Sequence, residues 1–249
     1  MNNKIFQHFH GYELLIKKAE KLLQYYQVTG CDAISDFYNP DEIEVLKKYF
    51  GDNYKYIFFG GYQQAVRKVV IFGDNISLSQ SICCLTAKFN KQFNKLDNRD
   101  VKGAVYNLGI DVNKIGDFWV EENNIYLYCK NEISDYLINN FKQIGRCHVD
   151  FTYIDFKEQN FKFETSTIIS TSLRLDSIVA SIIRKSREKS KERIVSGLVN
   201  VNYHLIEQCD YICEINDIIS LKKIGRYRIK DIQINKKSGK IILSIDKYI

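Results

Sequence analysis

The stretch at residues 173–202, LRLDSIVASIIRKSREKSKERIVSGLVNVN, constrains the fold most, because it places two demands on one short segment. Its apolar residues recur at helical spacing, so one face has to pack against a core. Between and after them stand seven basic residues: Arg174, Arg184, Lys185, Arg187, Lys189, Lys191 and Arg193. The sequence therefore predicts a helical element with one buried face and one strongly positive face.

This stretch divides into two expected helices. Ser172 is the predicted cap of the first, and Asp176 falls in its first turn, where the helix dipole favours a negative charge. Ser186 is the predicted cap of the second, which Gly197 ends. A rigid two-helix platform with this charge suits the phosphates of a structured polynucleotide, and Ser186 adds a hydroxyl at an open helix N-terminus.

The positive charge of the chain is unevenly distributed. The whole sequence has a net charge of +6, whereas residues 166–249 hold 16 Lys and Arg against 9 Asp and Glu. The last third therefore has a net charge of +7 and the remainder −1. A polyanion partner for the last third is the natural hypothesis, and a solvated basic face without a partner is the alternative.

Composition narrows the class of protein. No apolar run approaches the roughly 18 residues that a membrane helix needs, and the N-terminus lacks the pattern of a signal peptide. The seven cysteines include no C-x-x-C pair and no Cys/His cluster at zinc spacing. We therefore expect a cytoplasmic protein with reduced thiols, no membrane span, no metal site and no cofactor.

The order of patterns predicts an α+β protein of three domains. Residues 1–75 form a mostly helical, mixed segment. Residues 76–157 follow the order β-α-β-β-α-β, which predicts a ferredoxin-like domain of the type that RNA-recognition motifs share, although the RNA-recognition signature itself is absent. A polar connector at 157–166 precedes the basic domain, 166–249, in which two short helices pack on a small sheet whose strand candidates include 210–215.

The basic domain carries a resemblance to a known RNA-binding module. Arg-Leu-Asp, then Ser-Arg, a basic helix, Gly and Val-x-Val-Asn resemble the RNA-binding domain named after small-subunit ribosomal protein S-four. The later NDIISLKKIGRYRI resembles its G-D-x-I-S and G-R part, with Asn216 in place of the usual glycine. This resemblance covers nearly all of residues 170–249.

The first two thirds extend the resemblance to one family. DFYNPDEIEVLKKYFGDNYKYIFFGGYQQAVRKVVIF and DNRDVKGAVYNLGIDVNKIGD are similar to the N-terminal and middle parts of the bacterial YlmH family. Asn98 stands where that family has His, and Val66 where it has Glu. Family membership implies RNA binding at the ribosome: contact with ribosomal RNA of the large subunit, with tRNA as a further candidate, in rescue of stalled translation, and a historical link to cell division.

The resemblance also implies which residues contact RNA. Positions that match the module's motif are Arg174, Ser186, Arg187, Lys189, Lys191 and Arg226, and charge alone adds Lys185 and Arg193. Asp176 is expected to hold a basic neighbour in place, because a carboxylate aimed at a phosphate would repel it.

Two other interpretations of the function remain open. One is an RNA-modifying enzyme with its active site in the first two domains, although no catalytic motif that we searched for is present and we assign no catalytic residue. Residues 98–100, Asn-Arg-Asp, are a polar cluster with chemistry, a contact with RNA or the ribosome, or a helix cap followed by charges in the first turn. Gly60, Gly61, Tyr62 and Arg67 form either a second contact surface or a plain turn with a solvated arginine. The other interpretation is a protein that acts through other proteins in cell division.

Overall fold

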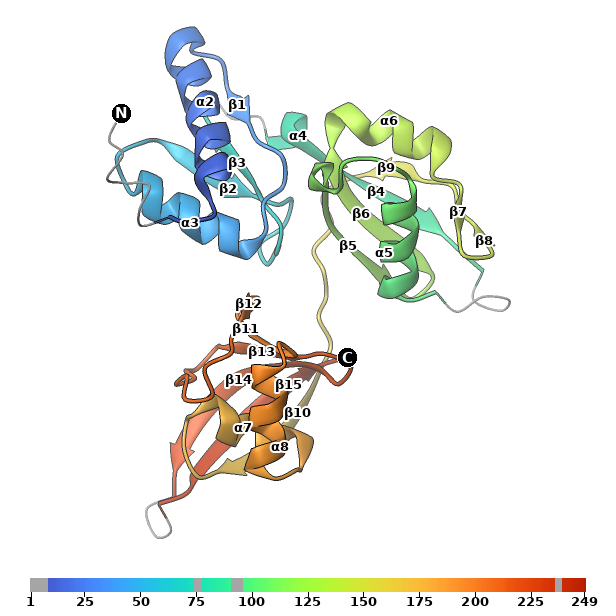
Figure 1. The fold of residues 1–249 in the computed structure, drawn as a ribbon. Helices are drawn as coiled ribbons and strands as arrows, with labels where there is room; N and C mark the ends of the chain where they lie inside the picture. Colours follow the sequence, from blue (N-terminus) through green and yellow to red (C-terminus); the bar gives the residue numbers. More distant parts are fainter. Residues whose placement is uncertain (1–8, 74–77, 91–95, 236–238) are drawn as a thin grey trace. The chain divides into compact units, whose positions relative to one another are not determined.

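The chain forms two compact units, 1–159 and 160–249, in a computed structural model (Figure 1). The structure describes residues 9–73, 78–90, 96–235 and 239–249. Helices are mixed with antiparallel sheets throughout, so the predicted α+β class is confirmed. Within the described ranges, no helix is both long and apolar enough to span a bilayer.

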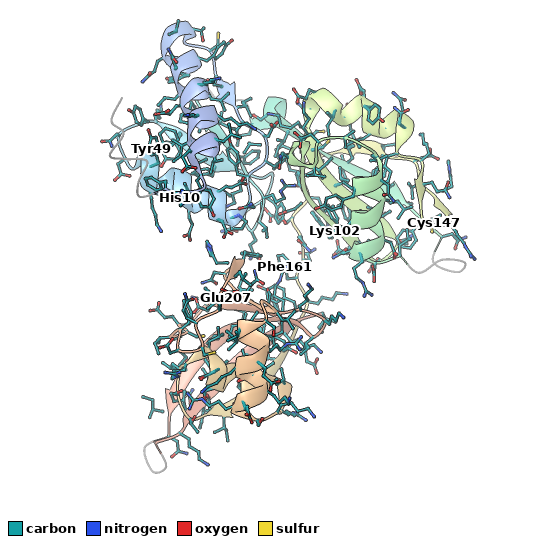
Figure 2. All side chains as sticks on the ribbon, in the orientation of Figure 1. His10, Tyr49, Lys102, Cys147, Phe161 and Glu207 are labelled. Atoms are coloured by element: carbon teal, nitrogen blue, oxygen red, sulfur yellow. The ribbon has the colours of Figure 1, made fainter. Side chains whose placement is uncertain are left out.

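The N-terminal unit begins with two helices over a small antiparallel sheet of order β1-β3-β2. Its elements are α2 (Glu13–Thr29), β1 (Ala33–Ile34), α3 (Pro40–Phe50), β2 (Tyr56–Phe59) and β3 (Val69–Phe72). Asn39 caps α3: its side chain accepts the N–H of Glu42, whose carboxylate accepts the N–H of Asn39 in return. Tyr49, labelled in Figure 2, donates to Glu20 at 2.5 Å and so links α3 to α2.

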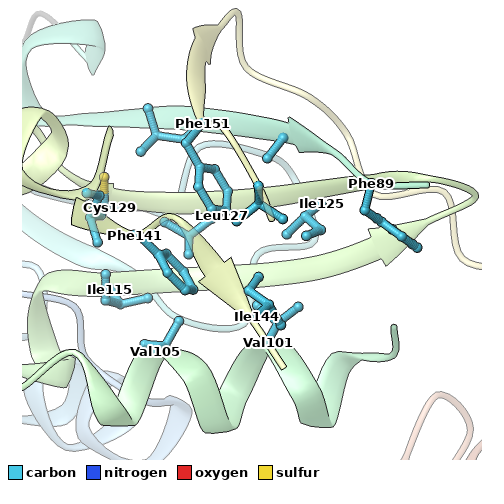
Figure 3. Close-up of a cluster of buried hydrophobic side chains, with 14 of the residues drawn as sticks. Phe89, Val101, Val105, Ile115, Ile125, Leu127, Cys129, Phe141, Ile144 and Phe151 are labelled. Atoms are coloured by element: carbon cyan, nitrogen blue, oxygen red, sulfur yellow. The ribbon is translucent and has the colours of Figure 1, made fainter. Parts of the chain in front are cut away.

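The unit continues into a four-stranded antiparallel sheet of order β5-β6-β4-β9. The elements are α4 (Leu78–Ser81), β4 (Ile82–Lys88), α5 (Asn98–Asn107), the 3₁₀ turn η1 (Val112–Lys114), β5 (Ile115–Glu121), β6 (Asn124–Lys130), α6 (Asn131–Asn140), β7 (Gln143–Ile144), β8 (Cys147–His148) and β9 (Thr152–Ile154). Helices α5 and α6 cover one face. Figure 3 shows Val101 and Val105 of α5 turned towards Ile115 and Ile125 of the strands.

The other face of this sheet is covered as well. Trp119 of β5 and Tyr128 of β6 are 2% and 0% exposed, and they pack with Tyr62, whose ring centroid lies 5.5 Å from each of theirs. Phe37 and Ile71 belong to the same cluster, so the first segment and the four-stranded sheet share one core. The sheet is therefore an internal layer of the unit rather than an open platform.

The C-terminal unit places two helices on a six-stranded antiparallel sheet of order β10-β15-β14-β13-β11-β12. Its elements are β10 (Phe163–Ser170), α7 (Leu175–Ile183), α8 (Arg187–Val195), β11 (Val199–Val201), β12 (His204–Leu205), β13 (Ile218–Leu221), β14 (Gly225–Ile234) and β15 (Ile241–Tyr248). Both helices lie over the same face (Figure 1). Ile178 and Ile194 of the helices share a core with Ile229 and Ile245 of the sheet.

Two sequence expectations in this unit are wrong. Residues 163–166, assigned to the polar connector, are the start of β10, which pairs with β15 over its whole length. Residues 210–215 form no strand; only Ile212 makes an isolated bridge, with Arg174. The carbonyls of Cys209 and Tyr211 instead accept the N–H groups of Asp176 and Leu175. That stretch satisfies the unpaired donors of the first turn of α7, so its backbone is not available for a sheet.

A pair of glycine substitutions tests the shared core of the N-terminal unit. Gly61 has φ +94°, and a Cβ there would lie 2.1 Å from the Tyr128 ring, whereas a Cβ at Gly103 in α5 meets nothing within 4 Å. We expect Gly61→Ala to lower the free energy of unfolding by about 3 kcal/mol, through overpacking and backbone strain. Gly103→Ala should raise it by up to about 1 kcal/mol.

The measurement is urea unfolding followed by the fluorescence of Trp119, the only tryptophan of the chain, which lies in this core. Equal stabilities of the Gly61→Ala and Gly103→Ala variants would contradict the proposed packing of the first segment against the sheet.

Candidate nucleic-acid interface

The helix pair of the C-terminal unit is held together by side chains from both helices. Leu175, Ile178 and Val179 of α7 are completely buried, as the helical spacing predicts. From α8, Ser190 and Ile194 are buried. The Ser190 hydroxyl donates to the backbone carbonyl of Asp176 at 2.5 Å, so a small polar residue of α8 fixes the helix against the first turn of α7.

Asp176 is the buried charge of this pair. Its side chain has no exposed surface, yet Arg174 and Arg187 donate to its two carboxylate oxygens at 3.3 and 3.0 Å. Burial by itself would raise the pKa of Asp176, but the hydrogen bonds and charges of the two arginines outweigh it and hold that pKa below its usual value. Asp176 therefore holds basic neighbours in place, as the sequence suggests.

The two arginines are fixed at the surface by this contact. Their side chains remain 36% and 48% exposed, although the buried carboxylate anchors both: Arg174 donates to both of its oxygens and Arg187 to one. A guanidinium carries five N–H donors, and Arg187 uses one of them on Asp176. Both groups are therefore positioned in advance, with donors left for an anion from solution.

Of the two predicted helix caps, one is confirmed and one is wrong. Ser186 caps α8, because its hydroxyl oxygen accepts the N–H of Lys189 at 3.4 Å, which confirms the prediction. Ser172 does not cap α7: Arg174 is the cap residue instead, and no side chain makes a capping hydrogen bond. The backbone contacts of residues 209–211 take the place of a side-chain cap there.

The basic residues of α8 lie on two flanks. Arg187 and Lys191, four residues apart, share the flank next to Asp176, whereas Lys189 and Arg193 share the opposite flank. Lys189 pairs with Glu192 at 2.9 Å, and Arg193 donates to the backbone carbonyl of Lys222. Lys191 is exposed and lies within 4 Å of no carboxylate among the described residues, and the same holds for Lys185 in the turn before α8.

The structure adds basic residues that were not among the predicted RNA contacts. The turn between β13 and β14 brings Lys222 and Lys223 beside the end of α8, through the contact with Arg193 and a hydrogen bond from the Lys222 N–H to Leu198. Arg184 ends α7 in the left-handed region, with φ +53°, and is exposed. The sequence signal for the turn was the pair of lysines, but its approach to α8 is a tertiary contact.

Arg226 is separated from the other seven predicted RNA contacts. Its neighbours in β14, Tyr227 and Ile229, belong to the core beneath the helices. Because successive side chains of a strand point to opposite faces, Arg226 lies on the face of the sheet that the helices do not cover. One flat contact surface cannot include both Arg226 and the helix pair.

The glycine and arginine motif of the first segment has a structural role that neither sequence interpretation anticipated. The half-buried Arg67 guanidinium donates to the backbone carbonyls of Val112, Ile115 and Phe37 at 2.6 to 3.2 Å, so its hydrogen bonds are used within the fold. Asp117 accepts the N–H groups of Val66 and Arg67 and the Tyr62 hydroxyl, and its burial raises its pKa. These bonds tie the segment to β5.

The Asn-Arg-Asp stretch at 98–100 is the first turn of α5. Asp97 is the cap residue of α5, and Asp100 completes the reciprocal pair of hydrogen bonds. Arg99 is 91% exposed and pairs with Asp97 at 2.7 Å, while the Asn98 side chain accepts the N–H of Val120. Across the described ranges, no group of three or more His, Cys, Asp and Glu side chains is arranged to hold a metal ion.

Three comparisons with known proteins found matches, and two of the matches carry the YlmH name. The family description "Putative RNA-binding domain in YlmH" matches residues 79–158. The "Ribosome-associated protein quality control protein P2" of Bacillus subtilis (strain 168) is 29% identical over 245 residues, which cover 95% of each chain. The "Cell division protein ylmH from Streptococcus pneumoniae" superposes with a TM-score of 0.50 at 15% identity, over 59% of this chain and 93% of that one, and shows a shared fold.

Removal of the Asp176 charge tests its anchoring role. Asp176→Asn keeps the size of the side chain but loses the charge-assisted hydrogen bonds, and we expect the free energy of unfolding of the C-terminal unit to fall by about 2 kcal/mol. Hydrogen exchange of peptides from α7 measures this directly. Asp231→Asn, in β14 of the same unit and hydrogen-bonded to Gln233, is the matched control and should change little. Equal protection in the two variants would contradict an anchoring role.

The lowered pKa of Asp176 also predicts how the stability of the C-terminal unit depends on pH. The pKa of Asp176 is lowered in the folded protein, and Arg228 and Thr165 lower that of Asp246 through hydrogen bonds at 2.7 and 2.6 Å. A carboxyl whose folded pKa lies below its unfolded value of about 3.9 stabilises the fold above that pH and loses the contribution as the pH falls through the folded pKa. Exchange protection of α7 should therefore decrease below about pH 4, and less steeply in Asp176→Asn.

Proposed function

Because the chain belongs to the YlmH family, we propose that it is a non-catalytic factor that binds ribosomal RNA of the large subunit and, as a second contact, tRNA, in the rescue of stalled translation. One observation carries the proposal: a buried carboxylate fixes Arg174 and Arg187 at the surface of a basic helix pair. The name of the Bacillus relative supports the ribosome as the location, and neither relative's name mentions a reaction.

Phosphate chemistry fits the helix pair. Protein contacts to structured RNA go largely to phosphates, and their strength depends on lysine and arginine that release counterions. The pair presents Arg174, Arg187 and Lys191 on one flank, and the turn residues Lys222 and Lys223 extend the other flank. An A-form duplex can be held by such an arrangement through its backbone, with no reading of base edges.

The middle of the chain is a weaker candidate for the main phosphate contact. Residues 79–158, which the family description covers, hold 10 Lys and Arg against 11 Asp and Glu. The sheet face on which RNA-recognition motifs stack bases is here occupied by Trp119 and Tyr128 and packed against the first segment. We therefore assign the principal RNA contact to the C-terminal unit.

A finer description of the fold is part of the same proposal. The strand order β5-β6-β4-β9 with two helices on one face supports a ferredoxin-like middle domain. The helix pair on a small sheet supports an S-four-type C-terminal domain. We retain domains at 1–75, 76–157 and 166–249, because each part contains a buried cluster of its own. A further cluster joins the first two parts, and the boundary at 75/76 lies outside the described residues.

The test reverses two charges that have no role in the fold. Lys185→Glu with Lys191→Glu changes exposed residues without carboxylate partners, whereas Arg187→Glu would place a second carboxylate beside buried Asp176. In sedimentation of a cell lysate, the wild type should travel with the large subunit and be released by high salt. The double variant should remain at the top, and the slope of log affinity against log salt should decrease by about one for each phosphate that the variant no longer neutralises.

The matched control is Lys17→Glu with Lys21→Glu, which makes the same change in net charge on α2 of the N-terminal unit. It should sediment as the wild type does. If the Lys185/Lys191 variant co-sedimented at wild-type levels, the helix pair would not be the docking surface.

A further inference from the structure

The sheet of the C-terminal unit has a second face, opposite the helices, which we call the open face. Register places Phe163, Tyr248 and Asp246 of the two neighbouring strands β10 and β15 on it, together with Arg226 and Arg228 of β14. The residues that alternate with them, such as Tyr227, Ile229 and Ile245, are in the core under α7 and α8. The open face is therefore distinct from the helix-pair surface proposed above.

Aromatic rings gather at one end of the open face. Phe163 and Tyr248 are cross-strand partners whose ring centroids lie 4.9 Å apart, edge to face. Phe161, labelled in Figure 2, packs against both, at 6.3 and 5.4 Å. All three rings are half-buried, so each keeps part of its surface accessible within this unit. The cluster lies at the sheet surface and contributes nothing to the helix-covered core.

Two arginines lie over these rings, with different partners. The Arg228 guanidinium is 4.7 Å from the Phe163 ring centroid and is neutralised by Asp246, to which it donates at 2.7 Å. Arg226 lies 5.3 Å from the Tyr203 ring and 5.6 Å from the Tyr248 ring. Among the described residues, no oxygen accepts a hydrogen bond from its side chain, whereas Arg174, Arg187, Arg193 and Arg228 each donate to one.

The Arg226 position is unusual for a purely structural arginine. A cation over two rings gains a modest stabilisation, but its five N–H donors have no acceptor among the described residues. A guanidinium plane held between tyrosines, with its donors unused, can stack on a base and hydrogen-bond a phosphate or a base edge at the same time. Its charge forms no ion pair with a carboxylate of the described residues, which favours an anionic ligand.

We propose that this end of the open face, formed by Arg226, Tyr203, Tyr248 and Phe163, binds unpaired nucleotides that leave the RNA duplex held by the helix pair. The inference rests on the proposed function, because it assigns the second face of the same unit to the same RNA. It gives Arg226 a place in RNA binding that the helix-pair surface cannot give it. Stacking on tyrosine and arginine is tolerant of sequence, so the site selects unpaired structure rather than a particular base.

The experiment compares RNA probes with the full-length chain. One is a blunt RNA hairpin, and another is the same hairpin with a single-stranded 3′ extension of about ten nucleotides; a third probe, oligouridine, is unpaired throughout. Fluorescence anisotropy gives each affinity. The wild type should bind the extended hairpin about tenfold more tightly than the blunt one, the scale expected from one base–aromatic stack.

Variants on the two faces separate the two proposals. Arg226→Ala should abolish the gain from the extension and leave the blunt hairpin unchanged. Lys185→Glu with Lys191→Glu should weaken both hairpins and leave binding of oligouridine in place. Failure of the helix-pair variant to weaken the blunt hairpin would therefore overturn the proposed function, whereas the absence of any gain from the extension in the wild type would overturn the open-face site alone.

Two substitutions at Tyr248 separate the contribution of the aromatic ring from that of the hydroxyl group and from any effect on folding. Tyr248→Phe keeps the stacking surface and should retain the gain, whereas Tyr248→Leu should lose it. Binding of the blunt hairpin by Tyr248→Leu verifies that this variant is folded. Equal behaviour of the Phe and Leu variants would overturn stacking as the mechanism. Loss of ribosome association in Arg226→Ala, with all RNA affinities unchanged, would overturn the RNA assignment and identify the face as a protein contact.

Discussion

The C-terminal unit depends on one buried carboxylate. Asp176 has no exposed surface and would be costly to bury alone, but Arg174 and Arg187 compensate its charge from the surface, and its own backbone carbonyl accepts the Ser190 hydroxyl. This single residue therefore sets the packing of α8 on α7 and the positions of two exposed guanidinium groups. The stability of the helix pair and the presentation of positive charge have the same physical origin, so a change that disturbs one is expected to disturb the other.

A comparable set of hydrogen bonds connects the two parts of the N-terminal unit, but there the central charged group is a cation. There the cation is the half-buried Arg67, which donates to the backbone carbonyls of residue 112 in η1 and residue 115 at the start of β5, while Asp117 of that strand accepts backbone N–H groups from residues 66 and 67. Gly61 allows the turn to lie against the Tyr128 ring. The consequence for function is that the aromatic face of the middle sheet is occupied internally. This leaves the surfaces of the C-terminal unit, one on the helices and one on the open face of its sheet, as the proposed RNA contacts.

Local patterns predicted those elements whose stability is decided within a few residues. Ser186 caps α8, and the spacing of Leu175, Ile178 and Val179 defines the buried face of α7, because both are properties of consecutive turns. The strand and helix order of the middle sheet follows equally from local alternation. Elements that depend on a distant partner were missed: β10 has a polar sequence and is a strand because β15 pairs with it, and residues 210–215 have the pattern of a strand, whereas the backbone at 209–211 caps α7.

The sequence by itself determined the α+β class, the concentration of positive charge in the last third and the residue types of the basic helix pair, because composition and periodicity are local quantities. Only the tertiary structure decided how the candidate residues are grouped. It joined Arg174 to Arg187 through Asp176, brought Lys222 to the end of α8, tied Arg67 to backbone carbonyls and placed Arg226 on the opposite face. The reason is physical: a motif specifies which side chains are present, but the pairing of strands and the packing of helices determine which of them face the same ligand.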